Sequence, residues 1–168
     1  MALWLALAGG ASADSGSLEY AVKANYLYKF APFVEWPDRA FPSATSPFNI
    51  CVVGLDPFGK GLDDAVQGQR VGDRPISVHR AAVAEPGMNC QILFASKSTA
   101  QSAADTMRAV AGEPVLTVTD QSRGVSGGMI QFVMREGRVK FEIDAAAAEA
   151  SGLQISSKLL GLATSLRR

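Results

Sequence analysis

The sequence predicts a single three-layer α/β domain, in which a mostly parallel β-sheet has helices on both faces and a C-terminal antiparallel hairpin. Short apolar runs of strand length alternate with segments whose apolar residues recur at helical spacing, an order typical of parallel sheets. Two apolar runs near the C-terminus are separated by a short polar turn, which indicates a hairpin. The length of 168 residues suits one hydrophobic core.

The first predicted element is a long helix over residues 18–36, with Leu18, Val22 and Leu27 at helical spacing. Pro32 lacks an amide hydrogen, so we expect a kink there, and Pro37 ends the helix after Trp36.

Four apolar runs are predicted as the parallel strands, with short helices between them and a hairpin after them. The strands are residues 48–53, 76–79, 91–95 and 115–119, the helices lie within 58–66 and 99–110, and the hairpin joins 129–134 to 139–143. Two helices complete the prediction. Asp144 caps the first of them and Gly152 ends it, while the second has an apolar stripe of Ile155, Leu159, Leu162, Ala163 and Leu166.

Charge and composition exclude several classes of function. Sixteen Lys and Arg balance sixteen Asp and Glu, and no segment concentrates one sign, so we expect no nucleic-acid partner. With one His and two Cys, a four-ligand zinc site is nearly excluded, and we expect no metal and no cofactor.

The N-terminus indicates export. A short apolar run is followed by the small residues Ala11-Ser12-Ala13 and then by a polar stretch, which is typical of a signal peptide over residues 1–13. The mature chain would be residues 14–168 and exported. The alternative is an apolar terminus on a cytosolic protein.

Two strings resemble catalytic motifs without meeting their requirements. Residues 54–61 match the phosphate-binding loop G-x-x-x-x-G-K, but Gly61 stands where Ser or Thr should bind magnesium, so a turn is the simpler interpretation. Residues 124–128 match G-x-S-x-G, but a predicted strand follows Ser126 where a helix is needed, and the only His, His79, lies upstream. We therefore predict that the protein is not an enzyme.

Cys51 and Cys90 are the only cysteines, and they lie in two strand-forming segments that could be neighbours. In an oxidising compartment such a pair usually forms a structural disulfide. Two buried free thiols or an intermolecular bond are the alternatives.

The order of several strings resembles the YfiR family. They are residues 24–37 (ANYLYKFAPFVEWP), 51–54 with 56–59 (CVVG, DPFG), 90–94 (CQILF), 115–120 (VLTVTD), 139–143 (VKFEI) and 155–160 (ISSKLL), which together span nearly all of the mature chain.

The resemblance implies a periplasmic regulator that restrains an inner-membrane diguanylate cyclase of the YfiN type, and is itself titrated by an outer-membrane lipoprotein of the YfiB type. Its output would be less cyclic-di-GMP and less biofilm. The resemblance also implies the Cys51–Cys90 bond, whereas a second cysteine pair that some relatives have is absent here.

The aromatic residues indicate a binding role independently of the resemblance. Six of the thirteen lie in the predicted first helix and cannot all face one core. Either they cover both the sheet and a neighbouring helix, or some form a partner or homodimer surface. The candidate partner-binding residues are Tyr26, Phe30, Phe33 and Trp36, with Leu153 and Ile155 as a second group between the last two helices. The alternative function is a small-ligand sensor that uses the crevice at the carboxyl ends of the strands.

Overall fold

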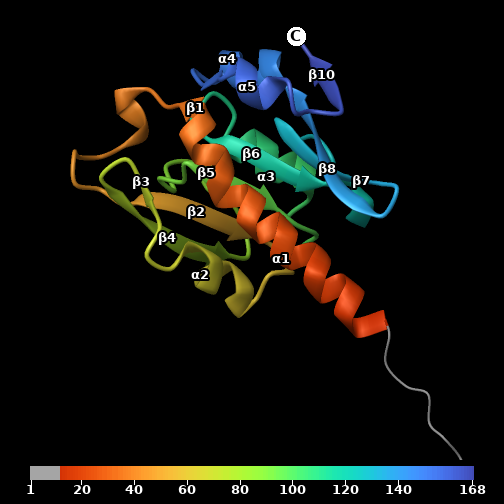
Figure 1. The fold of residues 1–168 in the computed structure, drawn as a ribbon. Helices are drawn as coiled ribbons and strands as arrows, with labels where there is room; N and C mark the ends of the chain where they lie inside the picture. Colours follow the sequence, from red (N-terminus) through yellow and green to blue (C-terminus); the bar gives the residue numbers. More distant parts are fainter. Residues whose placement is uncertain (1–11) are drawn as a thin grey trace, which may run out of the picture.

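The computed structural model describes residues 12–168, which form five α-helices and ten β-strands in an α/β arrangement (Figure 1). The α-helices are α1 (Ser12–Phe30), α2 (Lys60–Val66), α3 (Ala103–Ala109), α4 (Ala145–Ala150) and α5 (Ser157–Leu160). The strands are β1 (Val34–Glu35), β2 (Phe48–Val53), β3 (Arg70–Val71), β4 (Arg74–Ala81), β5 (Ile92–Ala95), β6 (Leu116–Asp120), β7 (Ile130–Arg135), β8 (Arg138–Asp144), β9 (Gln154–Ile155) and β10 (Ser165–Arg167). Three 3-10 turns complete the order: η1 (Ala31–Phe33), η2 (Asp38–Ala40) and η3 (Gln121–Arg123).

The main sheet is mostly parallel, as predicted. Its eight strands follow the order β10-β8-β7-β6-β5-β2-β4-β3, and only the β3/β4 and β7/β8 pairs are antiparallel. Strands β1 and β9 form a separate antiparallel pair. The predicted hairpin is β7 and β8, and Glu136 and Gly137 both have positive φ, which suits a two-residue turn.

Both faces of the sheet are covered by helices. Since alternate residues of a strand point to opposite sides, the buried strands contribute to two separate cores. Ile50 and Val52 of β2 belong to the larger core beneath α1 and α2. Cys51 and Val53 belong to the smaller core, which includes Val110 at the end of α3. In Figure 1, α1 crosses the front of the sheet and α3 lies behind it. The predicted three-layer architecture is confirmed.

The first helix is shorter at its C-terminal end than the sequence predicted. It ends at Phe30 and continues as the 3-10 turn η1 before the chain becomes the strand β1. Pro32 cannot donate a hydrogen bond to the carbonyl of Tyr28, so here proline ends the helix and does not merely kink it. The prediction that Trp36 is helical is therefore wrong.

The prediction of a last helix with a stripe from Ile155 to Leu166 is also wrong. Ile155 pairs with Val34 in the β9–β1 ladder, and α5 ends at Leu160. Leu166 lies in β10, which pairs in parallel with β8, and the amide of Thr164 donates to the carbonyl of Phe141 to begin that pairing. The exposed edge of β8 offered hydrogen bonds that outweighed the helical spacing.

The predicted boundaries of α4 are confirmed by their caps. The Asp144 carboxylate accepts from the amide of Ala147 at 3.0 Å, and Gly152 adopts a φ of 80° just beyond the helix. Most of the predicted signal peptide, residues 1–13, lies outside the described residues. Within residues 12–168, none of the helices meets the length and apolar content required for a membrane span.

Candidate functional site

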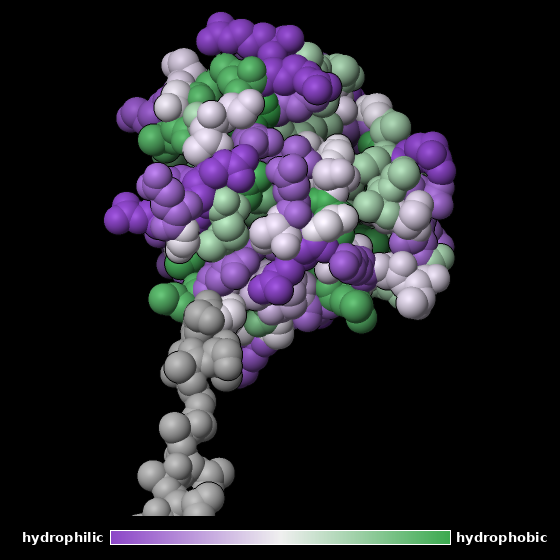
Figure 2. Space-filling model, turned by 90° about the vertical axis from the view of Figure 1, so that its right-hand side faces the viewer, coloured by the Kyte–Doolittle hydropathy of each residue, from purple (hydrophilic) through white to green (hydrophobic). Residues whose placement is uncertain are grey.

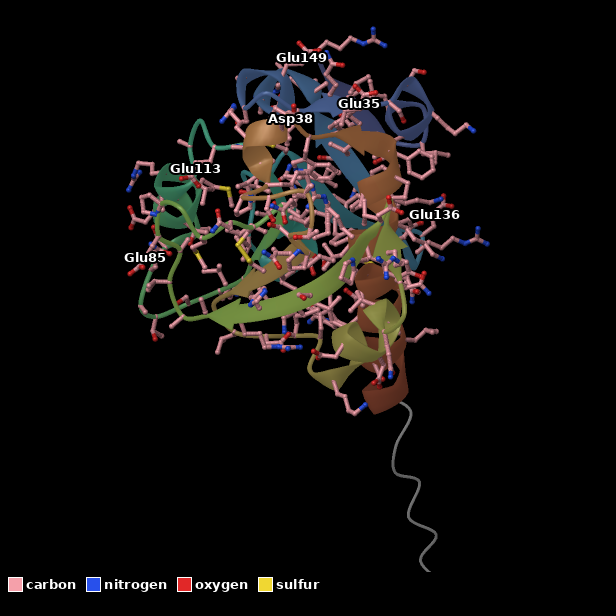
Figure 3. The ribbon with its side chains drawn as sticks, turned by 90° about the vertical axis from the view of Figure 1, so that its left-hand side faces the viewer. Glu35, Asp38, Glu85, Glu113, Glu136 and Glu149 are labelled. Atoms are coloured by element: carbon pink, nitrogen blue, oxygen red, sulfur yellow. A yellow bond between two sulfur atoms is a disulfide. The ribbon has the colours of Figure 1, made fainter. Side chains whose placement is uncertain are left out.

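The two cysteines form an intrachain disulfide, as the sequence predicted (Figure 3). Cys51 lies on β2, and Cys90 lies just before the neighbouring strand β5, with 5.9 Å between their Cα atoms. This separation is within the usual range for a disulfide. Both side chains are buried beneath the α3 face of the sheet. The bond therefore fastens the long connection that precedes β5 to the neighbouring strand β2, which is a structural role.

Two of the candidate partner-binding aromatics pack into the core. The side chain of Phe30 is only 1% exposed, and its ring centroid lies 5.3 Å from that of Phe141. Tyr26 is half-buried, and its ring lies 5.6 Å from the same Phe141 ring. Leu153 is fully buried. We therefore correct the candidate surface by removing Phe30 and Leu153, since neither side chain can reach a partner in this fold.

The structure joins the other two candidate groups through a short ladder. Val34 pairs with Ile155 and Glu35 with Gln154, while the amide of Ser156 donates to the carbonyl of Phe33 at 2.8 Å. The half-buried side chains of Phe33 and Ile155 thus come from one continuous surface. We call it the β1–β9 patch; it surrounds a cavity of about 170 Å³ lined by Pro32, Phe33, Glu35, Gln154, Ile155 and Ser156.

Trp36 follows the β1–β9 patch but is held toward the main sheet. Its indole Nε1 donates to the carbonyl of Gln91 at 3.2 Å, and its ring meets Phe48 edge to face at 5.0 Å. Trp36 therefore links the end of the β1 segment to the amino ends of β2 and β5. Figure 3 shows Glu35 and Asp38 at one end of the molecule together with Glu149 of α4.

A buried ion cluster fastens α1 over the carboxyl end of β6, and sequence reasoning missed it. Lys23 is fully buried; its ammonium group donates to the Asp120 carboxylate at 2.6 Å and to Glu19 one turn earlier. Ser122 accepts a further hydrogen bond from Lys23 at 3.2 Å, and Lys23 lies 4.8 Å from the Tyr20 ring centroid. Burial, followed by the Asp120 charge, raises the pKa of the Tyr20 hydroxyl above its ordinary value.

The Lys23 ammonium group lies where many α/β proteins bind ligands, at the carboxyl ends of parallel strands. The neighbouring part of that crevice is closed by backbone, because the amide of Leu55 donates to the carbonyl of Lys97 at 2.8 Å. A Cβ on Gly54 would come within 2.7 Å of the same carbonyl. A cavity of about 350 Å³ lies between Pro57, Phe58 and Gly61 and the N-terminal part of α1. At Gly54, the crevice at the carboxyl ends of the strands, which the sequence suggested for a small ligand, is therefore filled by the backbone of Lys97.

Residues 54–61, which resemble a phosphate-binding loop, are held to β4 by ion pairs between carboxylates and Arg80. Arg80 of β4 donates to Asp56 at 2.7 Å and to Asp63 at 2.6 Å, while the Asp56 carboxylate also accepts from the amide of Phe58. Phe58 is buried, with its ring 4.8 Å from that of Phe94. A phosphate placed in this loop would meet two negative side chains, so the geometry favours a structural turn.

The string that resembles a nucleophile elbow lies in the loop between β6 and β7. Ser126 comes just before β7, whereas His79 lies on β4. Four strand-to-strand steps separate β7 from β4 in the sheet, which corresponds to roughly 19 Å at the usual strand spacing. His79 instead lies 3.1 Å from the Asn49 side-chain oxygen. The two residues therefore cannot form a catalytic pair.

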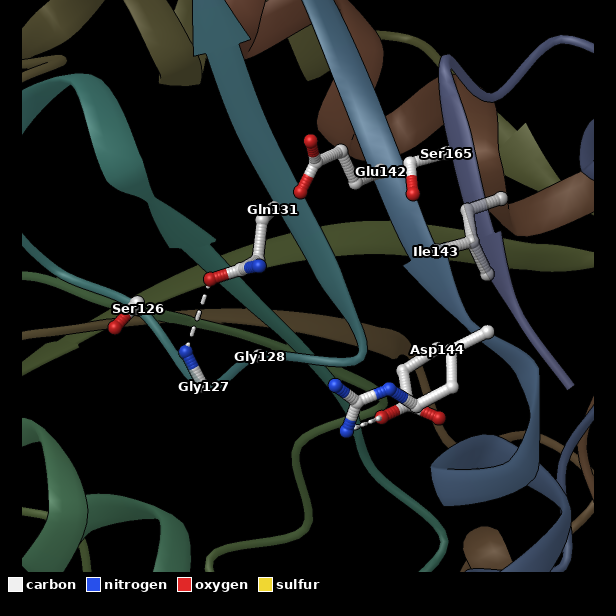
Figure 4. Close-up of a pocket in the computed structure, with 9 residues that line it drawn as sticks. Ser126, Gly127, Gly128, Gln131, Glu142, Ile143, Asp144 and Ser165 are labelled. Atoms are coloured by element: carbon white, nitrogen blue, oxygen red, sulfur yellow. Dashed lines mark hydrogen bonds and ion pairs between the residues drawn. The ribbon is translucent and has the colours of Figure 1, made fainter.

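Ser126 lines a polar cavity of about 400 Å³ at the β7–β8–β10 edge of the sheet (Figure 4). The Gln131 side-chain oxygen accepts from the amide of Gly127 at 3.0 Å, and Arg167 lies 3.8 Å from the Asp144 carboxylate. Within residues 16–168, we find no cluster of three or more His, Cys, Asp or Glu side chains arranged to hold a metal ion.

The fold and its buried disulfide define an α/β protein of the kind that oxidising compartments favour. A family model described as YfiR/HmsC-like matches residues 20–164, and the chain belongs to this family. At the level of the family, membership supports a periplasmic regulator in cyclic-di-GMP signalling. The resemblance inferred from the sequence is confirmed.

Proposed function

We propose that this protein is a periplasmic regulatory binding protein that restrains an inner-membrane diguanylate cyclase of the YfiN type. Restraint lowers cyclic-di-GMP and biofilm formation, and an outer-membrane lipoprotein of the YfiB type relieves it by binding the same protein. The observation that carries this proposal is the match of residues 20–164 to the YfiR/HmsC-like family. In this proposal the chain acts by binding and catalyses no reaction, and residues 1–13 direct its export.

The β1–β9 patch is the surface that we propose for the cyclase. Phe33 and Ile155 present partly exposed apolar side chains from two segments held together by backbone hydrogen bonds. Partly exposed aromatic residues on a rigid support are frequent anchors of protein interfaces. Trp36 supports this surface from the sheet side through its bond to Gln91. Tyr26 lies on α1, away from the ladder.

The test combines gene deletion with variants of the patch. Deletion is expected to raise cellular cyclic-di-GMP, and reintroducing the wild-type gene is expected to return cyclic-di-GMP to its original low level. A gene that carries Phe33→Asp should fail to restore the low level, because a charge is costly in the apolar contact proposed between the β1–β9 patch and the cyclase. Leu55→Asp is the matched control, since Leu55 is 70% exposed and lies at the opposite ends of the strands. It should restore the wild-type level.

Circular dichroism of the purified variant separates lost binding from lost structure, because Phe33 is half-buried. Glu35→Arg is a second variant of the same patch, and since Glu35 is exposed it should fold normally. If both folded variants restore cyclic-di-GMP to the wild-type level, the β1–β9 patch is not the contact surface. If deletion changes nothing while the cyclase is expressed, the regulatory function is wrong. A thermal-shift screen with small metabolites would then test the alternative of a ligand sensor.

A further inference from the structure

The outer side of β4 leaves an open edge on the main sheet, away from the β1–β9 patch. Strand β4 has eight residues, but its outer neighbour β3 pairs with only the first two of them. The amide of Ile76 then donates to the carbonyl of Gln69, and no described segment pairs with the outer side of residues 77–81. Figure 3 views the molecule from this side and shows β4 in front as a yellow-green arrow. We call residues 77–81 the β4 edge.

Two residues of the β4 edge turn unpaired backbone groups outward. The N–H and C=O of one residue point to the same side of a strand, and the side alternates along the strand. The carbonyl of Ala81 accepts from the amide of Gly54, which follows β2, and so points inward, whereas the amide of Ile76 points outward. The alternation therefore turns Val78 and Arg80 outward. Within the described part of the chain, their backbone groups have no hydrogen-bond partner on that side.

The β4 edge lacks the features by which sheet edges usually prevent pairing. It contains no proline and no lysine, and its register with β2 is continuous, without a bulge. Its one charged side chain, Arg80, is held on the α2 face of the sheet, where it pairs with Asp56 and Asp63. The backbone of the β4 edge is therefore accessible to another strand.

The second open edge, residues 138–140 of β8, is protected by charge. A second copy paired about Val139 would place Arg138 directly opposite Lys140, and like charges opposite each other destabilise a strand pair. Figure 2 views this hairpin side of the molecule and shows hydrophilic residues spread over it among smaller hydrophobic patches. Pairing between two copies is therefore favoured at β4 and not at β8.

We propose that the β4 edge pairs antiparallel with the β4 edge of a second copy, about a two-fold axis at His79. In this register Val78 of one copy faces Arg80 of the other, and each of these two pairs exchanges both backbone hydrogen bonds. Ser77 faces Ala81, and His79 faces its own counterpart. None of the facing pairs joins two Lys or Arg residues, or two carboxylates, which would destabilise the contact. The main sheets of the two copies become one continuous sheet.

The bounds of the β4 edge fit this symmetric register. At one end the outward amide of Ile76 is taken by Gln69, and at the other end the strand stops at Ala81 and the chain bends at residues 82 and 83. The free segment is therefore centred on His79, and each copy's strand ends where the partner's β3 segment begins. An isologous contact needs such a centre, whereas a strand of an unrelated protein does not. This proposal does not depend on the cyclase, so it stands or fails separately from the proposed function.

Engineered cysteines test the register in the mature protein isolated from the periplasm. Facing residues of a non-hydrogen-bonded antiparallel pair have Cα atoms about 4.5 Å apart, which a disulfide can bridge. His79→Cys should therefore give a disulfide-linked dimer under mild oxidation. Ser77→Cys alone should not, because residue 77 of one copy lies about 14 Å from residue 77 of the other. The double variant Ser77→Cys/Ala81→Cys should cross-link, because these two positions face each other.

Sedimentation equilibrium over about 1–300 µM protein measures the association, because so short a contact should form a weak dimer. Val78→Pro removes an outward N–H without loss of a hydrogen bond to β2, and should raise the dissociation constant at least about tenfold. Val139→Pro is the matched control. Val139 is half-buried, as Val78 is, and also points outward, since the carbonyl two residues later accepts from the amide of Thr164 on the outer side of β8. It should dimerise as the wild-type protein does, and circular dichroism checks that both variants fold.

Hydrogen exchange is a third measurement, which needs no substitution. The amides of Val78 and Arg80 should become protected as the protein concentration rises. The proposal is overturned by a protein that stays monomeric over the whole concentration range, by a dimer that folded Val78→Pro leaves unchanged, or by a dimer in which His79→Cys does not cross-link. Protection of both amides in the monomer would also overturn it, since the β4 edge would then be covered within one chain.

Discussion

Replacing the buried Lys23 by Met should destabilise the protein by about 3 kcal/mol, because the change leaves the Asp120 carboxylate buried without its cation. Asp120 is only 2% exposed, so water cannot replace the lost ammonium group. Removing one partner of a buried pair usually costs about 3–5 kcal/mol. The lower figure applies here, because Asp120 still accepts from the Tyr20 hydroxyl at 3.3 Å and from the Ser122 amide at 3.1 Å.

Chemical denaturation followed by the fluorescence of Trp36 and by circular dichroism measures this loss. For a chain of this length, about 3 kcal/mol lowers the Tm by about 6–12 °C. Lys60→Met is the matched control: the Lys60 side chain is 84% exposed and pairs with Asp64 on the surface, so the expected change is below about 1 kcal/mol. The double variant Lys23→Met/Asp120→Asn removes both charges and should recover stability relative to Lys23→Met alone.

The reasoning fails if the free energy of unfolding of Lys23→Met is within about 0.5 kcal/mol of the wild-type value, since the cluster would then not hold α1 on the sheet. It also fails if the double variant is as unstable as the two single changes added together. That result would mean that Lys23 and Asp120 contribute to stability independently and not as an ion pair.

Three further predictions concern the disulfide, the turn before α2 and the N-terminus. Cys51→Ser should lower the unfolding free energy by about 4 kcal/mol, because the bond closes a loop of 39 residues, and thiol titration of the denatured wild-type protein should find no free Cys51 or Cys90. The Arg80 guanidinium lowers the pKa of Asp63 below its ordinary 3.8, so Asp63 contributes stability above about pH 4 that is lost as the pH falls through its folded pKa. Arg80→Gln should remove this component from denaturation curves measured between pH 2 and 7, and an unchanged pH dependence would contradict the assignment. The intact mass of the periplasmic protein should correspond to a chain that begins at or near Asp14, and retention of Met1 would contradict export.

The central strands could be predicted because they are buried on both faces. The run ILFA of β5 is continuous and apolar, Asn49 is the one polar residue in the run FNICVV of β2, and no helical spacing competes with either run. The β7–β8 hairpin and the helix cap at Asp144 could also be predicted, since each depends on residues close together in the sequence. Local chemistry determined these elements.

The elements that were missed depend on contacts between distant segments. The ladder of Val34 with Ile155 joins positions 34 and 155, and two-residue strands have no periodicity to recognise. Lys23 falls between apolar positions, as a solvent-exposed lysine on a helix would, and nothing local shows that Asp120 lies opposite it. Phe30 was placed on a surface because helical spacing alone cannot tell which of two apolar faces meets the sheet. Leu153 was placed there because it lies in a predicted loop, and nothing local shows that the core covers it.

The two outer strands of the main sheet protect only part of each edge. At one edge β3 has two residues and pairs with Arg74 and Pro75 of β4, and at the other β10 has three and pairs with Glu142–Asp144 of β8. Among the described residues, no strand pairs with the outer side of residues 77–81 of β4 or of residues 138–140 of β8. Backbone groups on such an edge are available to a strand of another molecule. A homodimer, or a complex with another protein, can therefore be built through backbone pairing at such segments as well as through side chains, and point substitutions other than to proline would adjust mainly the second kind of contact.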